Sequence, residues 1–243
     1  MRYRRALVSV PVTAVLGIAI VGCSSASSST TATSASSPHA SASASSSAPA
    51  SLNGTQLGAA LLPAAAMPHG FELDRSSQRN TGDSTPSDTT QQVSPGHQCS
   101  LLDGTSWITA TGIAAGSFAQ NDYLTGDKTA EIAQEADAYS GGDAQHVMNV
   151  LWQVFGRCAQ FTDDSGGTSA AITMTRSKLS GVGDQAYEAV QTSSAWDGGN
   201  TLVAIRVGNV IVTCFESSPG NDKGSAALRY AESIATKMHS AMG

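Results

Sequence analysis

The chain has 243 residues, with 13 Lys and Arg against 19 Asp and Glu, which gives a formal net charge of −6. This acidic balance argues against a nucleic-acid partner, because phosphate binding depends on clustered Lys and Arg side chains. It also provides no polybasic segment that would hold the protein on an anionic membrane surface.

The first 22 residues have the organisation of a signal peptide. Arg2, Arg4 and Arg5 form a positively charged start, and residues 6–21 follow without a charge and are mostly apolar. The apolar stretch has sixteen residues, whereas a membrane-spanning helix needs about 20. We therefore expect residues 1–22 to be removed from the mature protein.

The end of this segment, Ile20-Val21-Gly22-Cys23, resembles the bacterial lipobox, whose cysteine is alkylated with diacylglycerol and becomes the new N-terminus. We predict that Cys23 is lipidated; the alternative is an ordinary secretory signal with an incidental cysteine. Two or three acyl chains exceed the marginal affinity of one chain, so the anchor would be stable. The expected location is the outer face of the cytoplasmic membrane, in contact with the lipid bilayer.

Residues 23–51 are predicted to be a lipidated, Ser/Ala-rich and disordered tether. From Ser24 to Ser51, 14 of 28 residues are Ser and none is Asp, Glu, Lys or Arg, so the stretch cannot bury apolar surface. A glycosylated stalk is an open alternative with the same Ser and Thr content. Residues 52–243 remain for one folded domain.

The first part of this domain combines a short helix, a loop and two strands. Leu57, Leu61 and Leu62 indicate a helix that starts near Asn53 or Thr55 and is broken by the prolines that follow. The polar residues 75–98 are expected to form a long loop, residues 99–107 one or two helical turns, and residues 114–124 a strand. Residues 129–139 have a helix-favouring composition but a strand-like alternation, and we choose a strand, partly on the family resemblance given below.

The second part begins with an amphipathic helix, for which Asp143 is a plausible N-cap. Its apolar stripe consists of Val147, Val150, Leu151, Val154, Cys158 and Phe161. Strands are expected at residues 168–175, 185–192, 201–207 and 210–216, with a Gly208-Asn209 hairpin between the last two. A helix near residues 225–239 closes the chain. We predict a single α+β domain in which two main helices pack on a twisted antiparallel sheet.

The order of these elements resembles the extracytoplasmic sensor domain of PknH-type mycobacterial serine/threonine kinases and its lipoprotein relatives in actinobacteria. The matching stretches are "QLGAALLPAAAMPHGF", "AQHVMNVLWQVFGRC", "SGVGDQAYEAV" and "VAIRVGNVIVTC", followed by an Ala-rich helix. The resemblance implies a sheet with helices and a cleft for an undefined ligand, without enzyme activity. Two features differ from the kinases: this chain has no kinase domain, and it has three cysteines after Cys23 where the kinase sensor domain has two disulfides.

Cysteines in an oxidising compartment are expected to pair. The resemblance implies a Cys99–Cys158 bridge, in which case Cys214 is an unpaired, buried small hydrophobe. The residues themselves leave Cys158–Cys214 open as an alternative, because Cys158 lies on a buried stripe and Cys214 shares a strand face with Val210 and Val212.

No motif in the sequence indicates catalysis, a metal or a cofactor, and we expect none of them. The histidines lack metal-ligand spacing, and there is no CxxC. Glu131, Glu135 and Asp137 could supply paired carboxylates for glycoside chemistry; we interpret them as the solvated face of a strand.

Two functions from different classes remain. The first is an envelope lipoprotein with a sensor-like domain that binds a small molecule, a lipid or an envelope protein. The second is a structural or accessory protein that binds another envelope protein, and an envelope hydrolase is a remote third. Trp196, beside Asp197-Gly198-Gly199 in an expected loop, is a weak candidate for a ligand contact, whereas Trp152 neighbours the buried helix stripe and is expected to be core or core edge.

Overall fold

A nine-stranded antiparallel sheet organises the part of the chain that the computed structural model describes, residues 51–85, 99–164, 169–219 and 225–242. The chain divides into the units Met1–Ala48 and Pro49–Gly243, and all described residues belong to the second. The strands are β1 (Phe71–Leu73), β2 (Arg79–Asn80), β3 (Ser117–Thr125), β4 (Glu131–Ala138), β5 (Gln160–Asp163), β6 (Ala170–Leu179), β7 (Gln185–Thr192), β8 (Gly199–Val207) and β9 (Val210–Ser218).

Three α-helices and three short 3-10 turns complete the domain. They are α1 (Gly54–Ala60), η1 (Ala64–Ala66), η2 (Ser100–Asp103), η3 (Trp107–Thr111), α2 (Asp143–Arg157) and α3 (Ser225–Met242). The predicted α+β class with an antiparallel sheet is confirmed.

The strand order is β1-β3-β4-β9-β8-β7-β6-β5, and β2 also pairs with β3. Strands β4 and β9 are therefore central although they lie far apart in the sequence, and all eight residues of β4 pair with β9, from Glu131 opposite Ser217 to Ala138 opposite Val210. The predicted hairpin joins β8 to β9 through Gly208 and Asn209, and Gly208 has a left-handed φ of 59°.

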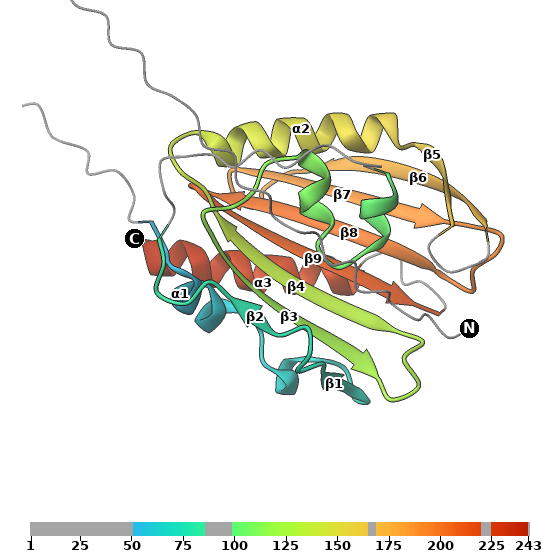
Figure 1. Cartoon of the computed structure of the whole chain (residues 1–243), viewed down its shortest axis with the longest axis horizontal. Coiled ribbons are helices and arrows are strands. Elements are labelled where there is room, and N and C mark those ends of the chain that lie inside the picture. The colour runs from blue at the N-terminus through green and yellow to red at the C-terminus, as the bar shows by residue number, and fades with distance from the viewer. Residues whose placement is uncertain (1–50, 86–98, 165–168, 220–224, 243) are drawn as a thin grey trace, which may run out of the picture. The chain divides into compact units, whose positions relative to one another are not determined.

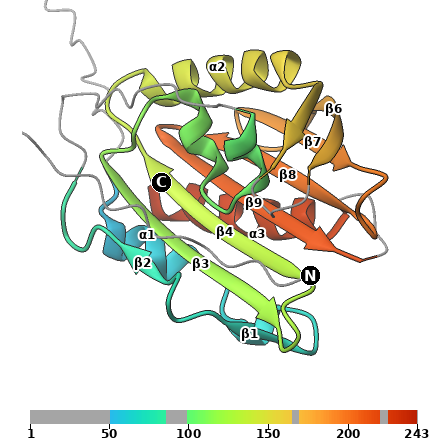
Figure 2. The ribbon, with the colours of Figure 1, turned by 45° about the vertical axis from the view of Figure 1, so that its right-hand side comes forward.

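Helices cover both faces of the sheet. Helix α3 packs on β8 and β9, and α1 packs on β3, on the face that lies away from the viewer in Figure 1. Helix α2 and the turns η2 and η3 lie on the opposite face, as the turned view in Figure 2 also shows. Each face has its own apolar cluster, one centred on Ile234 and Val212 and the other on Leu151 and Trp107.

Local signals explain the helix ends. Asn53 caps α1, because its side chain accepts from the Gln56 N–H (2.9 Å) while the Gln56 side chain accepts from the Asn53 N–H (3.0 Å), a reciprocal capping box. The expected N-cap of α2 was one residue off: Gly142 is the N-cap and Asp143 is the first helical residue, where its negative charge suits the positive end of the helix.

The expected loop at residues 75–98 was partly wrong. Arg79–Asn80 forms β2, which pairs with β3, and residues 86–98 of that loop lie outside the described part. Strands β1 and β5 were also missed. All three are two to four residues long and lie at the edges of the sheet, so they are too short to give an alternating pattern.

The turn between β6 and β7 provides a test of the fold with a matched control. Gly181 and Gly183 both have left-handed φ angles, 79° and 56°. A Cβ on Gly183 would lie 2.5 Å from the Arg206 carbonyl oxygen, whereas a Cβ on Gly181 would meet nothing within 4 Å.

We expect Gly181→Ala to lower the free energy of unfolding by about 1–2 kcal/mol, the cost of a left-handed conformation. Gly183→Ala should lower it by roughly a further 1–3 kcal/mol, because the added methyl group also overpacks the β7–β8 contact. Urea unfolding of both variants measures the difference. Equal losses would contradict the close approach of Gly183 to β8.

Candidate functional site

The sequence-predicted site residues lie in separate places. Cys23 falls outside the described residues. Trp196 is half-buried in the turn between β7 and β8, where its backbone N–H donates to the Ser193 carbonyl (3.2 Å). Trp152, expected as core, lies on α2 and packs at the edge of the apolar cluster under that helix. The Arg176 guanidinium lies 4.0 Å from the centre of its ring, so this face of the indole is covered.

A surface depression of about 430 Å³ lies over the outer strands β5 and β6. Its lining residues are Gln160, Phe161, Thr162, Ala171, Ile172 and Thr173. Trp196, the predicted ligand contact, is not among them and so does not line the depression. The depression is open, and a ligand in it would keep much more of its surface in water than one in an enclosed pocket.

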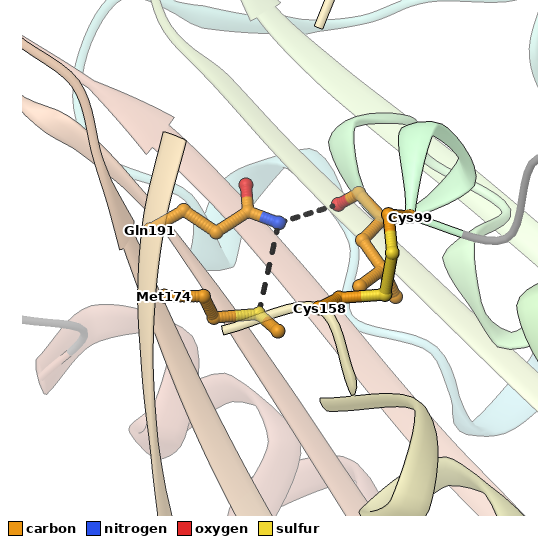
Figure 3. Close-up of a disulfide and its surroundings, with 5 residues drawn as sticks. Cys99, Cys158, Met174 and Gln191 are labelled. Carbon is orange, nitrogen blue, oxygen red and sulfur yellow. Dashed lines mark hydrogen bonds between the residues drawn. A yellow bond between two sulfur atoms is a disulfide. The ribbon is translucent and has the colours of Figure 1, made fainter. Parts of the chain in front are cut away.

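Residues 99–116, which we call the cover, lie across the α2 side of the central strands. The structure joins Cys99, at the start of the cover, to Cys158, at the end of α2, with a Cα–Cα distance of 5.5 Å. This is the pairing that the resemblance implied. Figure 3 shows the disulfide beside Met174 and Gln191, two residues of the sheet. The disulfide therefore joins the cover covalently to the end of α2 and lies beside the adjoining strands.

Cys214 lies on the opposite face of the sheet. It is fully buried in the cluster that β9 forms with α3, whereas Cys158 belongs to the cluster under α2. A Cys158–Cys214 bridge would have to pass through the sheet, which removes that alternative. Burial raises the pKa of the Cys214 thiol well above its usual range, so this thiol is unreactive.

Side chains of the sheet hold the cover in place. The disulfide fixes its first residue, and its last residue, Gly116, donates its backbone N–H to the Ala138 carbonyl (3.0 Å). Apolar residues of the cover, among them Trp107 and Ile108, are buried against the sheet and α2. Between these ends, Gln191, Asn200, Gln120 and Arg79 donate to Leu102 O, Asp103 Oδ1, Thr105 Oγ1 and Ser106 Oγ.

Beneath the cover, β3 and β4 present buried carboxyl groups. Asp122, Glu135 and Asp137 are 1%, 6% and 3% exposed. The expectation that Glu135 and Asp137 form a solvated strand face was therefore wrong. The alternation along β4 was recognised correctly, but α3 covers one face of the central strands and the cover and α2 lie on the other, so neither face of β4 meets water.

Glu135 and Asp137 are coupled to each other. They lie two residues apart on one strand face, and a hydrogen bond links their carboxyl groups. Burial raises the pKa of both groups, and the negative charge of Asp137 raises that of Glu135 further. Since two adjacent carboxylates in a dry site repel each other, the pair holds a proton at pH values where exposed carboxyl groups are ionised.

Three oxygens in this cluster lack a hydrogen-bond partner among the described residues. They are Glu135 Oε2, Asp137 Oδ2 and the hydroxyl of Tyr139, which is 2% exposed. Burial and the two nearby carboxyl groups raise the pKa of the Tyr139 hydroxyl well above its usual range. The nearby positive charge comes from Arg79, whose guanidinium donates to Gln120 Oε1 (2.7 and 2.9 Å) and lowers the pKa of Glu135 in part.

A second carboxyl pair lies at the disulfide end of the cover. Burial raises the pKa of Asp103 to about 7, and the adjacent Asp163 carboxyl adds to the shift. The Asn200 amide, which also donates to Gln191 Oε1 (3.2 Å), stabilises the ionised form and offsets part of this effect. One carboxyl pair, Asp103–Asp163, therefore lies at the disulfide end of the cover, and the other, Glu135–Asp137, lies on the strand beneath it.

Sequence reasoning missed the role of these carboxyl groups. Asp103 and Asp163 were not singled out, since they are 60 positions apart and no local motif joins them. A weak signal for buried carboxyl groups existed in β4, because its acidic residues alternate with Ala and Ile in a strand that pairs in the middle of a sheet.

The described residues offer neither a metal site nor a membrane-spanning helix. No group of three or more His, Cys, Asp or Glu side chains within them is arranged to hold a metal ion. None of the described helices is long and apolar enough to span a bilayer.

Comparison with known proteins identifies the fold. No protein-family model and no curated protein matches the chain. The structure is similar to the crystal structure of the extracellular domain of PknH from Mycobacterium tuberculosis, with a TM-score of 0.56 and 14% sequence identity over 79% of this chain and 97% of that one. The resemblance to the PknH sensor domain, expected from the order of sequence elements, is confirmed at the level of the fold.

Two buried tyrosines test the description of the polar cluster. The hydroxyl of Tyr123, which is 1% exposed, donates to the Leu62 carbonyl (2.7 Å), whereas that of Tyr139 has no partner. Tyr123→Phe should lower the free energy of unfolding by about 1–3 kcal/mol, because it leaves a buried carbonyl unsatisfied. Tyr139→Phe should leave the stability unchanged or raise it, as measured by urea unfolding. An equal loss in both variants would mean that the Tyr139 hydroxyl is hydrogen-bonded.

Proposed function

We propose that this chain is a lipid-anchored protein on the outer face of the cytoplasmic membrane, whose folded domain binds a ligand as a sensor does and carries out no catalysis. The observation that carries the proposal is the fold, which is similar to an extracellular domain of a protein that the resemblance places among sensor kinases. In this chain the domain follows a lipobox-like sequence.

The sequence Ile20-Val21-Gly22-Cys23, which follows a charged and then an apolar segment, supports the proposed lipid anchor. The disulfide supports the compartment independently, because such bonds persist in oxidising surroundings and are rare in the cytosol. Both observations favour an extracytoplasmic domain. Residues 24–51 then separate the domain from the bilayer, by roughly 30 Å if they behave as a flexible chain.

Two places are candidates for the ligand. The depression over β5 and β6 offers an apolar contact from the half-buried Phe161 beside hydroxyl and amide groups. Trp196, in the β7–β8 turn, offers a half-buried aromatic ring. The alternative function, an accessory protein docked through an apolar patch, has less support, since Leu101 is the one exposed large hydrophobic residue in the described ranges, at 40%.

The anchor is tested by replacing its cysteine. Cys23→Ala should prevent acylation, so the protein should move to the soluble fraction or remain as an uncleaved precursor, as followed by membrane fractionation and intact mass. Cys214→Ala is the matched control, because it also removes one cysteine but should leave both readouts unchanged. Unaltered membrane partitioning and mature mass in Cys23→Ala would contradict lipidation.

Ligand binding is tested by thermal shift with fractionated envelope lipids and glycans. A ligand at 100 times its dissociation constant adds about 2.7 kcal/mol, which raises the melting temperature by a few degrees for a domain of this size. Phe161→Ser should abolish the shift if the ligand binds in the depression, and Trp196→Ala should abolish it if the turn is the site. The absence of a stabilising fraction would contradict a ligand-binding function.

A further inference from the structure

The cover and the carboxyl groups beneath it form an arrangement that the proposed function does not use. The side chains of Glu135 and Asp137 on β4 leave one oxygen each without a partner, and the unpartnered Tyr139 hydroxyl lies close to both carboxyl groups. A buried carboxylate with an unsatisfied oxygen is far less stable than the neutral acid. The free-energy cost of burying the cluster is therefore lowest when it holds a proton.

The groups that face this pair offer little compensation for ionisation. Strand β3 presents Asp122, a further negative group, and Gln120, whose amide donates to both oxygens of Asp122 (2.8 and 3.0 Å). Strand β2 supplies one cation, Arg79, whose guanidinium is already shared between Gln120 and Ser106. Strand β9 presents the neutral Thr213 opposite Glu135, and the sequence of η3, WITAT, contains no titratable side chain.

The other end of the cover repeats the arrangement. Asp103, on η2, faces Asp163 at the end of β5, with the Asn200 amide as a neutral donor and Glu131 as a more distant negative charge. Ionisation of both members of either pair would place two negative charges between the cover and the sheet. Such charges repel each other strongly in a site from which water is excluded.

The cover has little regular structure of its own. Its regular structure consists of two 3-10 turns of four and five residues, and side chains of the sheet make most of its described hydrogen bonds to the strands. The Cys99–Cys158 bond would keep its first residue attached to α2 after release. By contrast, β8 and β9 share nine paired positions and α3 runs for 18 residues.

We propose that the carboxyl groups of Glu135, Asp137 and Asp103 form a proton-binding site that controls the cover: when protonated they hold it on the sheet, and when ionised they release it while the disulfide keeps it tethered. The proposal is independent of the ligand and of lipidation. It gives the domain a response to external pH, in which a rise in pH exposes an acidic surface on β3 and β4.

The sign of the response follows from linkage. A buried carboxyl group with a raised pKa binds its proton more tightly in the closed state than in the open one. The closed state is therefore most stable below the ordinary carboxyl pKa of about 4 and loses stability as the pH rises toward and through the raised values. The equilibrium between open and closed cover should change by up to about tenfold per pH unit for each proton released.

The test is hydrogen–deuterium exchange of the full-length lipoprotein in detergent micelles at about pH 5 and about pH 8, corrected for intrinsic exchange rates. In the wild type, the protection factors of residues 99–116 should fall at least tenfold between the two pH values, whereas those of β8, β9 and α3 should be retained. The double variant Glu135→Gln with Asp137→Asn should keep the cover better protected than in the wild type at the higher pH, because neutral amides replace two of the ionising groups.

Glu72→Gln, which removes an exposed carboxylate on β1, is the control and should behave as the wild type. If the double variant does not fold, Asp103→Asn carries the test and should retain protection at the disulfide end of the cover. Equal protection of the wild-type cover at both pH values would overturn the proposal. So would a loss of protection in the folded variants that matches the wild type, or a loss spread evenly over β8, β9 and α3.

Discussion

The constraint on which the rest of the domain depends is that β4 is buried on both faces and yet carries carboxyl groups. Its position between β3 and β9 places one face under the α1 and α3 side of the core and the other under the cover. Apolar side chains occupy most of the first face, together with the buried Gln134, whose amide oxygen accepts from the Leu62 N–H. Glu135 and Asp137 occupy the second, where burial raises the pKa of both carboxyl groups and so favours the protonated form.

The cover shields these carboxyl groups on the α2 side of the sheet. The cover packs buried apolar side chains, among them Trp107 and Ile108, on a surface that also carries carboxyl groups. The disulfide to α2 stabilises this packing by restricting the unfolded chain. The bonds from Gln191, Asn200, Gln120 and Arg79 then fix its path across the sheet. The domain thus combines a strongly paired antiparallel core with one covering element whose attachment depends on titratable groups, a combination suited to reporting a change in the surroundings.

The sequence predicted the elements whose signals are local. The apolar stripe of α2, the buried Ala and Ile positions of α3 and the Gly208-Asn209 hairpin were all recognised, because each pattern lies within one segment. The edge strands β1, β2 and β5 were not, since two to four residues show no periodicity and pairing with a distant partner defines them. The burial of Glu135 was missed for the same reason: alternation shows that a strand has two kinds of face, but residues from a separate segment decide whether the polar face meets water.

The central claim is that Glu135 and Asp137 hold a proton in the folded domain near neutral pH. Carboxyl-carbon NMR of protein labelled with 13C in its Asp and Glu side chains, titrated from about pH 4 to about pH 9, measures this directly. Exposed Glu side chains have a pKa of about 4.3 and are ionised at about pH 6. We predict that at this pH at least one signal of the pair, assigned through Glu135→Gln and Asp137→Asn, still has the shift of a protonated carboxyl group. Full ionisation of both groups at about pH 5 in the folded protein would contradict the account.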